Sequence, residues 1–375
     1  MKPADFFKLL SENKIHFYTG VPDSLLKNFC SFVNDNVSPE NHIISTNEGS
    51  AVALAAGHYL STGNPGFVYM QNSGFGNAIN PLLSLSDTEV YGIPVMLMIG
   101  WRGEPGKKDE PQHIKQGRVM IELLKSLEIP FRIFSSENNE VKKDIKELYE
   151  ISISNNCPAA MLISEGFFES YKSENNVENN YPVSREEAIK LIAGLTNEDD
   201  IIISTTGKTS RELYEFRDEK IFGHQNDFLT VGSMGHSSQI ALGISLNKKN
   251  NNVFILDGDG AVLMHMGSLA LIGSEAPENL KHIILNNGAH ESVGGQPTAG
   301  FKISFTEIAK ACGYKTTLLA ETREQIKNDF NVLKNSFGPS LLEIRINKNS
   351  RSDLGRPSSS PMENRNDFMK FLNQL

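Results

Sequence analysis

The chain has 375 residues, 39% of them hydrophobic, a formal net charge of −9 at pH 7 and a pI near 5.6. This length is typical of two or three domains, and the acidic balance argues against nucleic acid or a membrane surface as a partner. No apolar run approaches the ~20 residues that span a bilayer. The scattered cysteines Cys30, Cys157 and Cys312 fit neither a disulfide framework nor a zinc site, so we expect free thiols in a cytoplasmic protein.

Helical and strand-like segments alternate through residues 1–169. The predicted helices are Lys2 to Asn13, Leu25 to Val33 and Glu48 to Ser61, the last of which ends at Gly63. The predicted strands are Ile15 to Thr19, His42 to Ser45, Gly66 to Met70, Val95 to Ile99, Phe131 to Phe134 and Ala159 to Ile163. A long loop, Gly100 to His113, follows the fourth strand. This alternation predicts an α/β domain with helices on both faces of a parallel sheet.

Residues 170–184 are predicted to be a linker, because Ser170 to Tyr181 is a polar stretch. A second alternating half, residues 185–375, follows it. Its predicted strands are Ile201 to Ser204, Phe228 to Val231, Val253 to Leu256, Lys281 to Leu285 and Leu341 to Ile346, and Phe368 to Leu375 is a candidate last helix. We therefore expect two doubly wound parallel-sheet domains of similar size.

Polar residues follow two of these strands at a spacing that indicates a ligand site. The strand that begins at Val253 runs into Gly258-Asp259-Gly260, and the strand that begins at Lys281 ends at Asn286-Asn287. One crossover helix, about Met264 to Ser274, fits between them, so the two polar ends meet at one edge of the sheet. Carboxylate, amide and carbonyl oxygens suit Mg²⁺ or Ca²⁺, and glycines let a phosphate come close. The alternative for the Gly-Asp-Gly triplet alone is a plain glycine-rich turn.

With the asparagine pair, this segment resembles the cofactor-binding motif of thiamine-diphosphate-dependent enzymes. The resemblance implies Mg²⁺ held by Asp259, Asn287 and the carbonyl of Ala289. Asn286 is the alternative ligand, because the interval that follows Asp259 is one residue longer than in many relatives. The other residues that it implies at the cofactor are Thr206, Gly232, Ser233, Met234, Gly258, Gly260 and Ala261. Met234 would wedge under the cofactor, and its alternative is a core methionine.

Three titratable residues of the first half are candidate catalytic groups, namely Glu48, Asp23 and His113. The residues alone leave other interpretations open: a helix-dipole glutamate, a helix N-cap and a solvated loop histidine, respectively. The resemblance implies that Glu48 hydrogen-bonds the aminopyrimidine ring and promotes deprotonation of the thiazolium C2, and that Asp23 and His113 relay protons. Nearby alanines and a valine would supply the apolar pocket that this carboxylate requires.

Cations in the loop after the fourth strand indicate an anionic substrate. Arg102, Lys107 and Lys108 lie there in an otherwise acidic protein. A substrate with a phosphonate or sulfonate besides its carboxylate needs several such partners. Arg102 is the favoured one, because solvated lysines are the simpler interpretation of the other two. Ser24, His290 and Ser292 are further candidates for substrate binding.

Four stretches resemble the phosphonopyruvate decarboxylase family, to which sulfopyruvate decarboxylases are close: Tyr69 to Asn80, Gly100 to His113, Asn286 to Thr298 and Arg351 to Pro357. The resemblance implies a carboxy-lyase that uses thiamine diphosphate and Mg²⁺ in phosphonate (2-aminoethylphosphonate) biosynthesis. It implies a pyrimidine-binding domain at 1–169, a diphosphate-binding domain at 185–375, and a homo-oligomer with active sites between subunits. Sulfopyruvate decarboxylase and a non-catalytic regulatory homologue remain alternatives, although the presence of Glu48 and Asp259 disfavours the latter.

Overall fold

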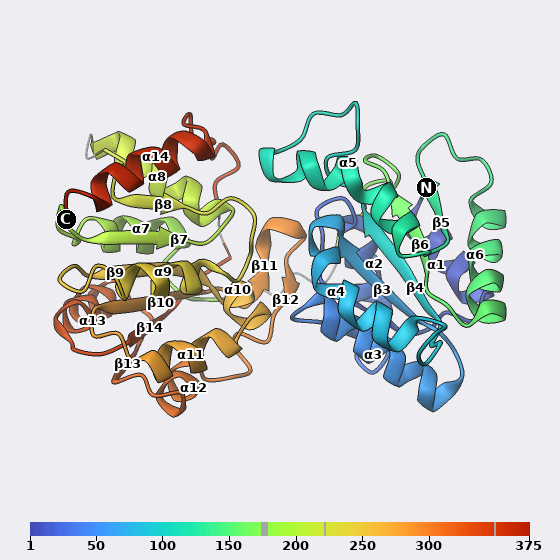
Figure 1. Ribbon diagram of the computed structural model, residues 1–375, viewed down its shortest axis with the longest axis horizontal. Coiled ribbons are helices and arrows are strands. Elements are labelled where there is room, and N and C mark those ends of the chain that lie inside the picture. The colour runs from blue at the N-terminus through green and yellow to red at the C-terminus, as the bar shows by residue number, and fades with distance from the viewer. Residues whose placement is uncertain (174–178, 221–222, 349) are drawn as a thin grey trace. The chain divides into compact units, whose positions relative to one another are not determined.

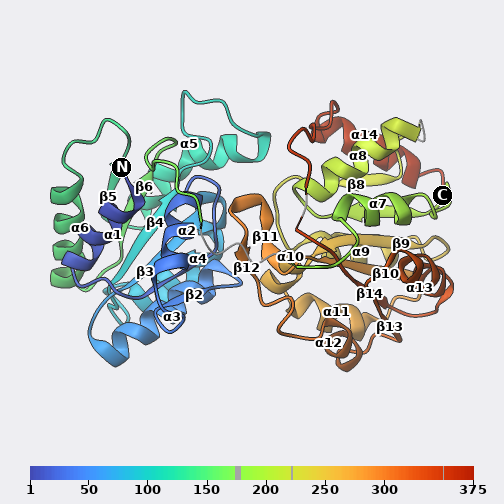
Figure 2. The ribbon, with the colours of Figure 1, turned by 180° about the vertical axis from the view of Figure 1, so that it is seen from behind.

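The computed structural model describes residues 1–173, 179–220, 223–348 and 350–375. The chain divides into two compact units, Met1–Asn176 with His290–Pro297, and Val177–Ala289 with Thr298–Leu375. Each unit contains one six-stranded sheet, and the strands pair in parallel. Figures 1 and 2 show helices on both faces of each sheet. The predicted α/β fold with two doubly wound parallel sheets is therefore confirmed.

In the first unit the strand order is β2-β1-β3-β4-β6-β5. The strands are β1 (Tyr18–Gly20), β2 (His42–Ile44), β3 (Gly66–Gln71), β4 (Val95–Gly100), β5 (Phe131–Phe134) and β6 (Ala159–Ile163). The helices are α1 (Pro3–Glu12), α2 (Lys27–Asn36), α3 (Glu48–Thr62), α4 (Phe75–Pro81), α5 (Pro111–Ser126) and α6 (Val141–Asn155). One apolar core joins α1, α2 and α6 to one face of the sheet, and another joins α3, α4 and α5 to the opposite face. Because both faces are covered, a central strand such as β4 is apolar and buried along its whole length.

In the second unit the strand order is β13-β14-β10-β9-β7-β8. The strands are β7 (Ile201–Ser204), β8 (Asp227–Leu229), β9 (Val253–Gly258), β10 (Leu280–Asn286), β13 (Thr316–Ala320) and β14 (Ser340–Arg345). The helices are α7 (Arg185–Ala193), α8 (Lys208–Lys220), α9 (Ser237–Ser245), α10 (Asp259–Met264), α11 (Gly267–Glu275), α12 (Phe305–Ala311), α13 (Arg323–Asn335) and α14 (Pro361–Leu372). The core under α7, α8 and α13 covers one face, and the core under α9, α11, α12 and α14 covers the other. A two-stranded ribbon pairs β11 (Ala289–His290) with β12 (Gln296–Pro297).

Two predicted boundaries in the first unit were wrong. The first strand begins at Tyr18 rather than Ile15, because the backbone amide of Ile15 still bonds to Leu10 in the turn that closes α1. The predicted loop from Gly100 to His113 is shorter, because Pro111 begins α5 at the first helical position, where proline is favoured. His113 therefore lies on a helix and is buried.

Three predicted features of the second unit also differ. The single crossover helix is split into α10 and α11 by a break at His265 and Met266. Strand β13 was not predicted, because this edge strand is only partly buried and lacks a continuous apolar run. The last helix begins at Pro361, seven residues before the predicted Phe368, because Ser360 and Glu363 form a capping box there.

The predicted linker falls partly on residues 174–178, which lie outside the described residues. Before that gap, the Tyr171 hydroxyl donates a 3.1 Å hydrogen bond to Asp35. After it, the Asn179 side chain donates to the carbonyl oxygen of Asn287 at 3.2 Å. Within the described ranges, no helix combines the length and apolar character that crossing a membrane requires.

Candidate active site

In the first unit, polar loops follow four adjacent strands at their carboxyl ends. In the sheet order, Glu48 follows β2, Asp23 follows β1, Gln71 ends β3 and Arg102 follows β4. Parallel pairing puts these strand ends at one edge of the sheet, which is where open α/β sheets hold ligands. The candidate residues from three separate predicted strands are thus brought to one edge.

Glu48 is the first residue of α3 and is buried. Asn47 caps the helix with its side-chain oxygen, and Glu48 lies in the first turn, where a carboxylate also complements the helix dipole. Its Oε2 accepts a 2.8 Å hydrogen bond from the Asn77 side chain, and burial raises the pKa of its carboxyl group above the ordinary value. A Cβ at Gly74 would lie only 2.0 Å from Oε1, so glycine is required beside this carboxylate.

Asp23 is buried in the loop between β1 and α2. Its carboxylate accepts hydrogen bonds from the Leu25 backbone amide at 2.9 Å and from the Gln71 side chain. Burial raises the pKa of Asp23, although these hydrogen bonds and the charge of Arg102 oppose that rise. A Cβ at Gly100 would lie 2.3 Å from Oδ2, so the carboxylate packs directly on the end of β4.

Arg102 and His113 share one partner, Asp109. The Arg102 guanidinium binds both oxygens of the Asp109 carboxylate, with Nε 2.8 Å from Oδ2, and its Nη1 donates to the Ser24 hydroxyl at 2.7 Å. His113 Nδ1 lies 3.0 Å from Asp109 Oδ1. Arg102 and Asp109, but not His113, line a cavity of about 220 Å³, whose other charged or hydroxyl side chains are Ser24, Glu104, Lys107, Lys108 and Glu165. Lys107 is paired with Glu104 at 2.8 Å.

In the second unit, Asp259 begins α10 directly after β9 and is buried. Burial raises the pKa of its carboxyl group to about 6, although hydrogen bonds from the Thr298 hydroxyl and backbone amides oppose the rise. No described cationic side chain forms an ion pair with it. A buried carboxylate without a counter-charge is the arrangement that a bound cation would stabilise.

The two asparagines after β10 have different environments. The Asn286 side-chain nitrogen donates to the Gly300 carbonyl and to Glu343, each at 2.9 Å, and its oxygen accepts from the Gly288 amide at 3.1 Å. Asn286 is therefore committed to packing within the fold. The Asn287 oxygen accepts from the Ala289 amide at 3.0 Å, which forms a tight turn, and the Asn287 backbone amide bonds to Asp259.

The oxygen donors around Asp259 fit a hard divalent cation. Within the described part of the chain, no group of three His, Cys, Asp or Glu side chains could hold a metal ion by itself. A metal at Asp259 would thus depend on amide and carbonyl oxygens, which Asn287 and Ala289 can supply and which Mg²⁺ accepts. A Cβ at Gly258 would meet nothing within 4 Å, so this backbone is open to a phosphate.

The loop after β8 approaches the same edge of the second sheet. Gly232, Ser233 and Gly235 have positive φ values of 73°, 48° and 84°, so the loop turns sharply around Met234, which is partly exposed. A Cβ at Gly235 would lie 2.8 Å from the Ala261 carbonyl oxygen, so the loop packs tightly on α10. The Thr206 hydroxyl, after β7, accepts a 2.9 Å hydrogen bond from the Gly232 amide and links the two loops.

His290 and Ser292 belong to a segment that groups with the first unit. His290 is half-buried, and Ser292 is exposed on a short 3-10 helix, Glu291–Val293. Within this segment, the Gln296 side chain donates to the Ser31 hydroxyl of α2 at 3.3 Å. Among the hydrogen bonds and ion pairs of the described residues, none joins His290 or Ser292 to a charged side chain. Their contacts therefore do not identify a role for either residue.

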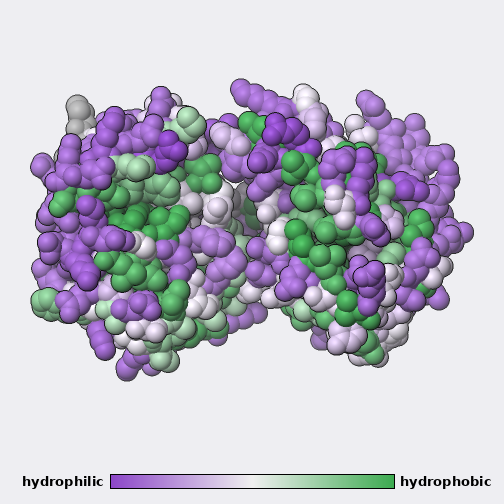
Figure 3. Space-filling view, in the orientation of Figure 1, coloured by the Kyte–Doolittle hydropathy of each residue, from purple (hydrophilic) through white to green (hydrophobic). Residues whose placement is uncertain are grey.

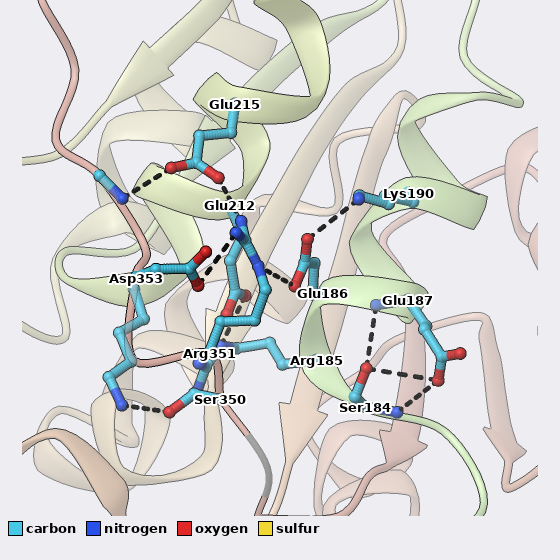
Figure 4. Close-up of polar contacts among 12 residues, drawn as sticks. Ser184, Arg185, Glu186, Glu187, Lys190, Glu212, Glu215, Ser350, Arg351 and Asp353 are labelled. Atoms are coloured by element: carbon cyan, nitrogen blue, oxygen red, sulfur yellow. Dashed lines mark hydrogen bonds and ion pairs between the residues drawn. The ribbon is translucent and has the colours of Figure 1, made fainter. Parts of the chain in front are cut away.

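The tail arginine Arg351 is occupied by acidic side chains (Figure 4). Its guanidinium pairs with Glu186 of α7 at 2.9 Å, with Glu215 of α8, and with Asp353 at 3.3 Å. The backbone amide of Gly355 also donates to Glu215 at 2.6 Å. These contacts attach the tail to α7 and α8, so Arg351 as it stands is not available to an anionic substrate.

Sequence reasoning missed four side chains that hold the candidates in place: Gln71, Asn77, Asp109 and Thr298. All four lie inside stretches that carry the family resemblance, and Asp109 is four residues before His113. Recognising Pro111 as a helix start would have suggested that Asp109 and His113 lie together. Nothing in the sequence indicated the direction of the other three side chains.

Comparison with known proteins agrees with this geometry. The N-terminal TPP binding domain of thiamine pyrophosphate enzymes matches residues 4–124, and the C-terminal TPP binding domain matches residues 206–344. Phosphonopyruvate decarboxylase of Streptomyces viridochromogenes is 32% identical, with 98% of this chain and 94% of that protein covered. This chain belongs to the phosphonopyruvate decarboxylase family of thiamine pyrophosphate enzymes. Within that family, the enzyme of Streptomyces hygroscopicus is also 32% identical, over 95% of this chain and 90% of the relative. Sulfopyruvate decarboxylase of Methanosarcina acetivorans is 28% identical, over 97% of this chain and 96% of the relative.

Proposed function

We propose that this protein is a carboxy-lyase that converts 3-phosphonopyruvate to phosphonoacetaldehyde and CO₂, with thiamine diphosphate and Mg²⁺, in phosphonate biosynthesis. The observation that carries the proposal is the 32% identity to two phosphonopyruvate decarboxylases over almost the whole chain. Sulfopyruvate decarboxylation is the second candidate, because a sulfopyruvate decarboxylase is 28% identical over a similar length.

The metal in this proposal is Mg²⁺ held by Asp259, Asn287 and the carbonyl of Ala289. Two observations support it: the buried Asp259 carboxylate has no described cationic partner, and the Asn286 side chain is engaged elsewhere. Gly258, Gly260 and Ala261 would lie beside the diphosphate, and Thr206 and the Gly232–Met234 turn, which are linked by a hydrogen bond, would be further contacts. When bound, thiamine diphosphate supplies the nucleophilic carbon and the electron sink that decarboxylation needs.

Glu48 would hold and release a proton at the aminopyrimidine ring. Burial raises the pKa of the Glu48 carboxyl group above its ordinary value, which favours a group that can hold a proton before releasing it. Asn77 fixes the orientation of Oε2, and the absence of a side chain at Gly74 leaves room for Oε1. Asp23 and His113 would move protons closer to the reacting carbon of the substrate, and the raised pKa of Asp23 supports that role.

Arg102 would bind the phosphonate, with Ser24 beside it and with His290 and Ser292 as further contacts. The cavity lined by Ser24 and Arg102 has a volume of about 220 Å³, enough for a small doubly charged 2-oxo acid. Asp109 already neutralises much of the Arg102 charge. The phosphonate would therefore add to, or compete with, an existing ion pair.

The active protein would be a homo-oligomer with sites between subunits, because the pyrimidine-binding and diphosphate-binding parts belong to different units of the chain. Apolar side chains are exposed on the first unit, such as Leu60 at 73% and Tyr91 at 72%. Figure 3 shows hydrophobic areas between hydrophilic ones on one face of each unit.

The deciding experiment is a turnover assay with phosphonopyruvate, sulfopyruvate and pyruvate, in the presence of Mg²⁺ and thiamine diphosphate. We expect kcat/KM for phosphonopyruvate to exceed the other two values. A higher value for sulfopyruvate would replace the proposed substrate, and no turnover of any of the three would overturn the proposed activity.

A further inference from the structure

The Asp109 carboxylate contacts both Arg102, the cation of the candidate site, and His113, its candidate proton carrier. Its Oδ1 accepts from the Glu110 amide at 2.7 Å and from the Arg102 guanidinium, and it lies 3.0 Å from His113 Nδ1. Its Oδ2 accepts from Arg102 Nε at 2.8 Å and from the Gly103 amide at 2.7 Å. The side chain is only 10% exposed, so these contacts are shielded from water.

The loop that carries Asp109 is packed against the start of α5. A Cβ at Gly103 would lie 2.0 Å from the His113 carbonyl oxygen, and a Cβ at Gly117 would lie 1.8 Å from the Gly103 carbonyl oxygen. Trp101 Nε1 donates to the Gly117 carbonyl at 2.8 Å, and Asn72 bonds both the amide and the carbonyl of Arg102, at 3.1 and 2.8 Å. Asp109 is therefore held on a rigid support rather than on a free loop.

The charge of Asp109 determines which nitrogen of His113 carries a proton. Burial alone would raise the pKa of Asp109, but the bonds from Arg102, His113 and two backbone amides hold it well below its ordinary value. The carboxylate stays ionised and can only accept, so the contact requires a proton on Nδ1. In the tautomer with its proton on Nδ1, the ring presents Nε2 as an acceptor, which is the form a proton relay needs.

We propose that Asp109 is a positioning residue that fixes the ring orientation and the tautomer of His113 while holding the Arg102 guanidinium. The inference rests on the proposed decarboxylase activity and on the role proposed for His113. Carboxylates that orient metal-bound histidines typically contribute ~10–100-fold to activity, and we take that range as the scale for a carboxylate that orients His113.

The test is a double-mutant cycle of Asp109→Asn, His113→Gln and the double variant, measured on the full-length protein with Mg²⁺ and thiamine diphosphate. We expect Asp109→Asn to lower kcat about 10-fold or more in the wild-type background and less than about 2-fold in the His113→Gln background. The KM for thiamine diphosphate should not change. The rate is measured with whichever of the three 2-oxo acids the wild-type protein turns over, so an error in the phosphonate assignment leaves the cycle intact.

Asp144→Asn is a matched control. Asp144 is a carboxylate of the same unit, 15% exposed, which lies 3.9 Å from Arg132 Nε and accepts from Asn138 at 2.8 Å. Its substitution should change kcat less than about 2-fold. Equal losses from Asp109→Asn with and without His113 would overturn the proposal, since Asp109 would then act through the fold or through Arg102. If Asp109→Asn does not fold, Asp109→Ser replaces it in the cycle, and failure of both to fold would make Asp109 structural and the proposal wrong.

Discussion

Replacing Asp259 with Asn should stabilise the protein in the absence of metal and cofactor, and should remove its stabilisation by them. Burial raises the pKa of Asp259 from 3.8 to about 6 in the folded chain. A difference of about 2.2 pKa units corresponds to roughly 3 kcal/mol, at ~1.36 kcal/mol per unit. The folded state binds this proton more tightly than the unfolded state does, so above pH 6 the ionised carboxylate destabilises the fold by up to that amount.

The raised pKa of Asp259 also determines how the effect of this substitution depends on pH. As the pH falls from 6 towards 3.8, the folded state takes up the proton first, and the wild-type protein regains the lost free energy of unfolding relative to the Asn variant. We expect Asp259→Asn to raise the free energy of unfolding of the metal-free protein by about 1–3 kcal/mol at pH 8, and to have little effect at pH 4. The lower end of this range allows for lost hydrogen bonds, because the side-chain nitrogen of Asn cannot accept a hydrogen bond as the carboxylate oxygen of Asp259 does.

Urea unfolding, followed with and without Mg²⁺ and thiamine diphosphate, measures both effects. At free ligand concentrations of about 100 times Kd, the wild-type protein should gain about 2.7 kcal/mol, and the Asn variant should gain almost nothing. Adding ligand should therefore shift the difference in stability between the two proteins by about 2.7 kcal/mol in favour of the wild-type protein. An Asn variant that is less stable at pH 8 without ligand, or that gains as much from ligand as wild type, would refute the reasoning.

Four further predictions concern the reaction. Glu48→Gln should bind thiamine diphosphate yet exchange its C2 proton about 100-fold more slowly or worse, and an unchanged rate would remove Glu48 from the mechanism. Gly74→Ala should also slow this exchange, because the new Cβ would lie 2.0 Å from Glu48 Oε1, whereas Gly76→Ala, with nothing within 4 Å, is the matched control. Mixing Glu48→Gln with Asp259→Ala subunits should restore part of the activity if sites are shared, and no recovery after verified subunit exchange would contradict that. Arg102→Met should lower kcat/KM for phosphonopyruvate by about one to four powers of ten, from ~2–5 kcal/mol, while barely changing pyruvate turnover. Equal losses with both substrates would mean that Arg102 is structural or binds the substrate carboxylate.

The sequence alone determined the fold class and the family of this protein. Alternating apolar strands and amphipathic helices predict parallel sheets, because buried parallel strands require apolar residues on both faces. The sequence also revealed the Gly258-Asp259-Gly260 turn and the Asn286-Asn287 pair. Glycine gives the backbone its freedom and Asp or Asn supplies oxygen ligands, so residue type and spacing were enough to recognise them. Edge strand β13 escaped prediction, since a half-exposed edge needs no continuous apolar run.

Only the tertiary structure decided which partner each candidate side chain has. Long-range packing brings Asn77 to Glu48 and Gln71 to Asp23, and the helix that begins at Pro111 brings His113 to Asp109. The same packing places the Asn286 side chain against Glu343 and pairs Arg351 with three acidic side chains. These pairings depend on side-chain direction and burial across residues far apart in the chain, and spacing along a sequence does not encode them.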